Sequence, residues 1–102
     1  MKPKNCTLVI GRSIYIRKQC EGMVLSTADN IIRGYANDVK SILEKYIPAD
    51  VTLTLDKAPR LLLGSVEMCI VALKDGKHYP AHYWVGTEIW KELEKNYRVR
   101  SQ

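Results

Sequence analysis

The sequence predicts an α+β domain in which about four antiparallel strands carry two helices on one face. Apolar residues recur at helical spacing in two segments, 27–47 and 87–97, and they alternate with polar residues, as in a strand, over 51–56. The predicted order is strand, helix, three strands, helix, and packing both apolar helix stripes on one sheet face buries them together. Since 102 residues is the size of one domain, we assign 1–102 to a single core.

The first strand is expected over 7–17, where β-branched and aromatic residues are frequent. Four aliphatic residues in this segment have the same parity, so a continuous strand would place them on one face. This favours one long strand bent at Gly11, although a tight hairpin at the same place is the alternative. The four residues are Leu8, Ile10, Ile14 and Ile16.

A long helix is predicted next. Ser26 offers an N-cap, and Asp29 follows three residues later, where its carboxylate can accept a hydrogen bond from the backbone N–H of the cap. Apolar residues then continue at helical spacing as far as Tyr46. Pro48 should end the helix near Ile47, because the residue before a proline is disfavoured in the helical conformation.

Two further strands precede a turn. Apolar and polar residues alternate over 51–56, which predicts a strand with one buried face. Segment 66–73 is apolar at nearly every position, which is typical of a central strand buried on both faces. The intervening segment 57–65 contains Pro59 and Gly64 and is expected to be a loop. Its three consecutive leucines need apolar cover.

Asp75 and Gly76 predict a two-residue hairpin turn, because both tolerate positive φ angles. The return strand is expected over 77–85. Pro80 has no N–H to donate to a neighbouring strand, so this strand is placed at the edge of the sheet.

The final helix is expected to begin at Thr87 as its N-cap, with Glu88 complementing the helix dipole. The basic tail 98–102 is expected to fray.

The charge balance is basic, with a net charge of +5 and a pI near 9.2. The sixteen Lys and Arg residues are scattered rather than aligned in a stripe, and the tightest groups include Arg17-Lys18 and Arg98/Arg100. Such a balance permits binding to nucleic acid or to an acidic protein surface.

The three cysteines are odd in number and widely spaced, which predicts neither a disulfide framework nor a zinc cage. No apolar run reaches the roughly 20 residues needed to cross a bilayer. The early stretch Leu8-Val9-Ile10 is also too short for a secretory signal. We therefore expect a cytoplasmic protein without a membrane segment.

No catalytic, metal or cofactor site is expected. On a strand, His78 and His82 would lie about 13 Å apart and could not share an ion. The turns at Gly11 and Gly86 lack the glycine pattern and the lysine of a nucleotide-binding loop.

Aromatic residues predict a binding surface instead. The chain has no Phe, and its eight aromatic residues are all Tyr or Trp, which are favoured at interfaces. Several of them are interleaved with histidines in the predicted edge strand 77–85, whose exposed face would carry a ladder of rings. The same edge offers pairing with a second copy of the chain. The predicted partner-binding residues are His78, Tyr79, His82, Tyr83 and Trp84.

From Thr27 onward, the order helix, strand, strand, hairpin, strand, helix resembles the double-stranded-RNA-binding domain. The resemblance is in topology, and it implies contact with phosphates through basic loops and the start of the last helix. In this chain Lys91 is the one basic residue there, next to Glu88, whereas the family carries a lysine cluster. The residues expected to bind nucleic acid are Lys57, Arg60, Lys74, Lys77 and Lys91.

These observations predict a non-catalytic adaptor or inhibitor that docks on a larger protein or nucleoprotein partner and modulates it. Small accessory proteins of phages and mobile elements are often of this type. The alternative is a nucleic-acid-binding domain that uses its basic surface, either on duplex RNA or by stacking unpaired bases. The sequence identifies neither the partner nor the oligomeric state.

Overall fold

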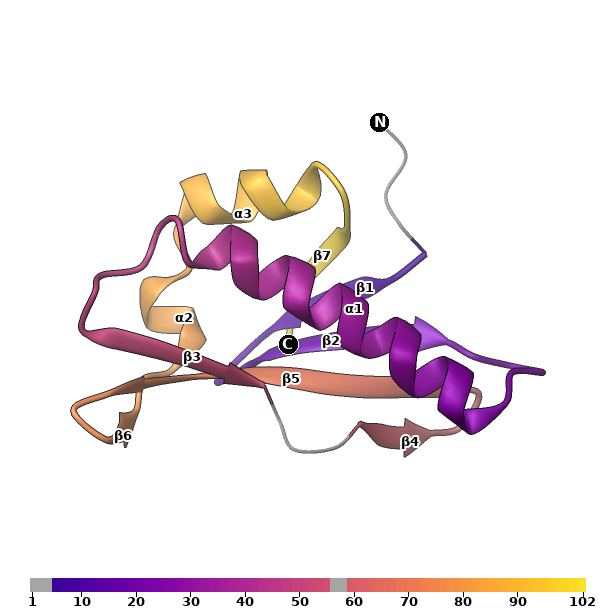
Figure 1. The fold of residues 1–102 in the computed structure, drawn as a ribbon. Helices are drawn as coiled ribbons and strands as arrows, with labels where there is room; N and C mark the ends of the chain where they lie inside the picture. Colours follow the sequence, from indigo (N-terminus) through magenta and orange to yellow (C-terminus); the bar gives the residue numbers. More distant parts are fainter. Residues whose placement is uncertain (1–4, 56–58) are drawn as a thin grey trace.

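The computed structural model describes residues 5–55 and 59–102, and within them it shows a mixed sheet of seven strands with three helices (Figure 1). The α+β class is confirmed. The prediction of about four antiparallel strands and two helices is wrong, because the sheet is larger and one strand pair is parallel. The elements are β1 (Thr7–Ile10), β2 (Ile14–Gln19), α1 (Leu25–Leu43), β3 (Val51–Leu55), β4 (Arg60–Leu62), β5 (Ser65–Lys74), β6 (Lys77–His78), α2 (Ala81–Trp84), α3 (Thr87–Glu94) and β7 (Arg98–Ser101).

The centre of the sheet is β5, as its nearly continuous apolar sequence predicts. The main strand order is β3-β5-β2-β1-β7. β4 pairs with the beginning of β5 on the same edge as β3, and β6 pairs with its end on the same edge as β2. The turn between β5 and β6 is the predicted two-residue turn, with φ angles of 53° at Asp75 and 73° at Gly76.

Residues 7–19 form a hairpin and not one bent strand. β1 pairs antiparallel with β2, and Ile10 lies opposite Ile14 across a three-residue connection. Partners directly opposite each other in a hairpin share a face, so Leu8 and Ile16 also remain on the same side of the sheet. The parity on which the single-strand prediction rested is therefore equally compatible with the observed hairpin.

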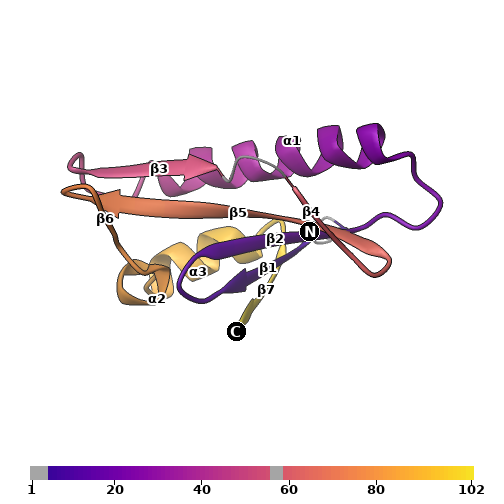
Figure 2. The same ribbon diagram turned by 90° about the horizontal axis from the view of Figure 1, so that it is seen from below.

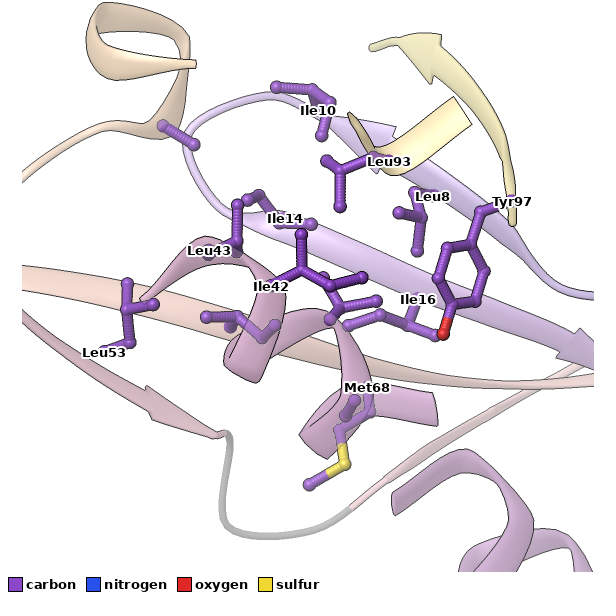
Figure 3. Close-up of a cluster of buried hydrophobic side chains, with 14 of the residues drawn as sticks. Leu8, Ile10, Ile14, Ile16, Ile42, Leu43, Leu53, Met68, Leu93 and Tyr97 are labelled. Carbon is purple, nitrogen blue, oxygen red and sulfur yellow. The ribbon is translucent and has the colours of Figure 1, made fainter. Parts of the chain in front are cut away.

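One face of the sheet is covered by α1 and α3, which lie behind the strands in Figure 2. α1 begins at Leu25, one residue before the predicted cap Ser26, and ends at Leu43, followed by a turn before Pro48. In the described parts of the chain, no helix is long and apolar enough to cross a membrane. Between helices and sheet lies the core, whose side chains (Figure 3) include Leu8, Ile14, Ile16, Leu43, Met68, Leu93 and Tyr97.

The predicted return strand 77–85 is wrong beyond its first two residues. β6 ends at His78, and Pro80 precedes the short helix α2 with φ = −59°, an angle that suits the entry to a helix. The backbone N–H groups of Ala81 and His82 donate to carbonyl oxygens in the β1–β2 connection, at 2.8 and 3.1 Å. α2 is thus held against this hairpin turn.

The tail, expected to fray, instead forms β7 beside β1. The pair is parallel, with Thr7 opposite Arg98 and Ile10 opposite Ser101. The Gln102 N–H donates to the Ile10 carbonyl at 3.0 Å, and a Cβ at position 11 would collide with the Gln102 side chain, so Gly11 permits this close approach. β7 satisfies the edge of β1 that would otherwise be open.

Tyr97 fixes the chain where it enters β7. It is 1% exposed, its hydroxyl donates a hydrogen bond to the Asp38 carboxylate of α1, and its ring meets the Tyr35 ring edge-on with centroids 6.2 Å apart. Burial, followed by the hydrogen bond to Asp38, raises the pKa of the Tyr97 hydroxyl above its usual value. This side chain connects α1 to the strand that follows α3.

We predict that Tyr97→Phe lowers the free energy of unfolding by about 1–2 kcal/mol, because it removes the hydrogen bond from the buried hydroxyl to the Asp38 carboxylate. The raised pKa adds a pH dependence: stability is retained below about pH 10, where the unfolded tyrosine begins to ionise, and falls as the pH rises further. Tyr97→Phe should reduce this alkaline loss. Urea denaturation at pH 7 and pH 10.5 measures both effects, with Tyr83→Phe, at an exposed tyrosine, as the control. Equal changes in both variants would contradict the prediction.

Candidate binding groove

The sheet face that α1 and α3 do not cover, here called the open face, is turned to the viewer in Figure 2. The strand register places one residue from each of five neighbouring strands in a row across this face, and four of the five are charged. In strand order from β7 to β4 the row is Arg98, Thr7, Arg17, Glu67 and Arg60. The next row is Arg100, Val9, Tyr15 and Cys69.

A groove of about 710 Å³ crosses this end of the sheet and is here called the arginine groove. Its lining comes from β7, β1, β2 and the β4–β5 turn, which are neighbours in the sheet although they are distant in sequence. Four basic side chains line it, and Glu21 is the one acidic residue in the lining. The basic residues are Arg17, Lys18, Arg98 and Arg100.

Lys18 is the most unusual of these four. It lies opposite Val66 with the parity of Ile16, so its side chain leaves the sheet on the helix-covered side, and it is only 8% exposed. Within 5–55 and 59–102 its ammonium group has no hydrogen bond or ion pair. In the same residues every side-chain nitrogen without a hydrogen bond has some contact with solvent. The ammonium therefore reaches water at the groove, while its stem is buried. An anion in the groove can therefore reach this ammonium group, which has no partner among the described residues, and pair with it.

The arginines differ in how they are held. The Arg17 Nε donates to the Glu67 carboxylate at 2.6 Å, and the Arg60 guanidinium lies 4.0 Å from the same carboxylate, which is 4% exposed. Glu67 thereby orients Arg17 and neutralises one of two positive charges. Arg98 and Arg100 have no ion-pair partner among the described residues. The row across the open face keeps a net positive charge.

Acidic residues concentrate on the opposite layer. On the open face Glu67 is the one acidic residue in the two rows given above. α1 and α3 together carry five, which lie on the far side of the sheet from the arginines of the groove. They are Asp29, Asp38, Glu88, Glu92 and Glu94. The row across the open face therefore carries an excess of positive charge, whereas α1 and α3 carry these acids together with Arg33, Lys40 and Lys91.

The structure does not bring the five predicted partner-binding residues onto one face. Tyr79 and Trp84 pack against the core, and the Trp84 indole N–H donates to the Tyr79 carbonyl at 3.2 Å. The ladder of rings does not form, because 79–85 is not a strand. Tyr83 is 72% exposed on α2, with its ring centroid 4.4 Å from that of His82.

His78 lies against the β1–β2 connection, where its Nε2 is 3.4 Å from the Ser13 hydroxyl and its Nδ1 is 3.3 Å from the Arg12 guanidinium. A guanidinium can only donate, so we infer that Nδ1 accepts and that Nε2 carries the proton. In this tautomer His78 cannot take the proton of Ser13, as a general base would. In the part of the chain that is described, no three His, Cys, Asp or Glu side chains are grouped as metal ligands.

The residues predicted to bind nucleic acid are also dispersed. Arg60 belongs to the open face, Lys74 and Lys77 flank the β5–β6 turn, and Lys91 lies on α3. Lys57 lies outside the described residues. The sequence analysis missed the four residues of the arginine groove as a site, although it noted Arg17-Lys18 and Arg98/Arg100 as the tightest basic groups. Only the pairing of β7 with β1 shows that the two groups meet.

No protein-family model, curated protein or solved structure matches this chain. The predicted topological resemblance to the double-stranded-RNA-binding domain also loses its third strand, since 77–85 forms only the two-residue β6. The function is therefore argued from the side chains of the arginine groove.

We predict that Lys18→Met raises the free energy of unfolding by up to about 1 kcal/mol. Methionine fills a similar volume, and the cost of keeping an unpaired ammonium group in a mostly buried place disappears. Chemical denaturation at pH 7 measures the change, and Lys77→Met, at an exposed position of β6, should leave stability nearly unchanged. A clear loss of stability in Lys18→Met would show that the ammonium is satisfied within the fold.

Proposed function

We propose that the protein is a non-catalytic nucleic-acid-binding protein that holds a phosphate backbone in the arginine groove. The observation that carries the proposal is Lys18, a mostly buried lysine without a partner among the described residues, which lines a groove together with three arginines. A phosphate group brought into the groove would supply the anion that the fold does not supply. We propose that the protein modulates a larger nucleoprotein complex through this contact, so the groove is the part to test first.

The arrangement of the cations favours a polymer over a single small anion. Arg98 and Arg100 alternate along β7 on the open face, about 6.6 Å apart at the rise of a strand, and Arg17 lies two strands away from β7. Positive charges repeated along and across the strands match an anion whose charges also repeat. Arginine adds two parallel hydrogen bonds to one phosphate, which a point charge cannot provide.

The mechanism that follows is electrostatic. The four basic side chains replace the counterions that are condensed around the phosphates of the nucleic acid. The release of these ions drives association. Arg17 is already oriented by Glu67, so less side-chain entropy is lost when it binds. No bond is made or broken in the ligand.

We predict a steep salt dependence. Four phosphate contacts with a single strand give a slope of roughly −3 in a plot of the logarithm of the association constant against that of the salt concentration. Lys18→Met should make the slope shallower by about 0.7, because it removes one contact, whereas Lys77→Met should leave it unchanged. Fluorescence anisotropy of a labelled oligonucleotide between 50 and 200 mM salt, about the range in which such contacts are resolved, gives both slopes. Equal slopes in the two variants would argue against the groove.

A second candidate function is docking on a protein through α2. Tyr83 is 72% exposed beside His82, and an exposed tyrosine with an apolar ring and a polar tip is typical of interface anchors. This corresponds to the adaptor or inhibitor predicted from the sequence, reduced to two of the five residues. A cytoplasmic location suits both candidates, since no disulfide forms among the cysteines of the described chain.

We predict different losses for the two candidates in a pull-down from cell extract. If α2 is the docking site, a stoichiometric protein partner survives nuclease and high salt, is lost with Tyr83→Ala and is kept with Lys18→Met, because the tyrosine contact is screened little by salt. Recovery of nucleic acid that high salt removes, unaffected by Tyr83→Ala, would decide against protein docking at α2.

A further inference from the structure

We infer that the ligand of the arginine groove is an unpaired nucleic-acid strand, with its bases against Tyr15 and the apolar lip of the groove. This inference rests on the proposed function and specifies its substrate class. It is carried by the apolar side chains that border the basic ones, which phosphate binding alone does not explain.

Tyr15 is the aromatic residue of the open face. It lies opposite Val9 on β1 and Cys69 on β5, in the same row as Arg100, and two residues before Arg17 on β2. Tyr15 is partly exposed, and in the described chain its hydroxyl has no hydrogen-bond partner. A base stacked on Tyr15 would have its neighbouring phosphate within reach of Arg17, whose Cα is about 6.6 Å further along the strand.

The lip of the groove is aliphatic. Leu63 in the β4–β5 turn lines the groove and is fully exposed, and Leu61 before it is also exposed. The Cys20 N–H donates to the Gly64 carbonyl at 3.2 Å, which places the segment leading to α1 beside this turn. Met23, Val24 and Leu25 in that segment are also exposed, although they do not line the groove itself. The three leucines that needed cover in the sequence thus remain largely without it in the described structure.

Basic side chains beside an apolar surface match a ligand that has both negative charges and apolar faces. A duplex keeps its bases stacked inside and offers mainly phosphates and sugars, so the aliphatic lip would face nothing apolar. An unpaired strand offers phosphates on one side and base faces on the other, and it bends easily. It can therefore follow the open face and turn over the lip.

The experiment compares two ligands of one sequence. A labelled single strand of about 12 nucleotides, within the site sizes of about 4–16 known for single-strand binders, is titrated with the protein, and the same sequence is then tested as a duplex. We expect the single strand to bind at least about tenfold more tightly. Tyr15→Leu should weaken single-strand binding at least about fivefold, since one base stack is lost, and should leave duplex binding nearly unchanged.

Tyr83→Leu is the matched control, because it removes an exposed tyrosine away from the groove and should not change either affinity. Leu63→Ser should weaken binding of the single strand and leave binding of the duplex unchanged. Tyr15→Trp provides a second measurement that does not depend on losing the ring. Its added fluorescence, relative to the unmodified protein, should be quenched by the single strand and not by the duplex.

The outcomes separate the inference from the function on which it rests. Equal binding of single strand and duplex, with Tyr15→Leu indistinguishable from the unmodified protein, would overturn the inference and leave phosphate binding in the groove intact. Failure to bind either nucleic acid would overturn both. Binding only to vesicles that contain anionic lipid would also overturn both and assign the lip to a membrane.

Discussion

The burial of Tyr97 is the constraint on which the candidate site depends. Its ring packs between α1 and the sheet and its hydroxyl is bonded to Asp38, so the chain leaving α3 is directed along the edge of β1. Arg98 and Arg100 follow at once and are placed beside the side chains of β1 and β2. One buried hydrogen-bonded aromatic residue thereby sets the position of two of the four cations in the groove.

Much of the fold follows from local patterns in the sequence. The long helix, the alternation of β3, the apolar β5 and the Asp75-Gly76 turn were predictable because periodicity and turn chemistry act over a few residues. The hairpin at Gly11 was not, because a hairpin and a straight strand give the same parity to Ile10 and Ile14. Pro80 was correctly excluded from the middle of a sheet, but local chemistry did not reveal that it precedes a helix docked on the first hairpin.

The candidate site was harder to predict from the sequence than the fold, for a physical reason. Arg17 and Arg98 are far apart in the sequence. They become neighbours of one β1 residue, Thr7, only through two strand pairings. The burial of Lys18 likewise depends on its being paired with Val66. The resemblance to the double-stranded-RNA-binding domain directed the prediction instead to residues such as Lys74 and Lys77, beside the β5–β6 turn, and Lys91 on α3. Charge alone does not define a surface until the register is known.

The parallel pairing of β7 with β1 also has a consequence for how the protein is made. β1 is synthesised before β7, and its outer edge is satisfied only after the helices and strands between them have followed. Contacts so distant in sequence form late, because closing the long intervening loop costs entropy before any interaction offsets it. A chain that lacks β7 therefore lacks Arg98 and Arg100, and with them half of the basic residues of the groove. The site is thus acquired only when the pairing of β7 with β1 is complete, and only molecules that have reached this stage compete for ligand.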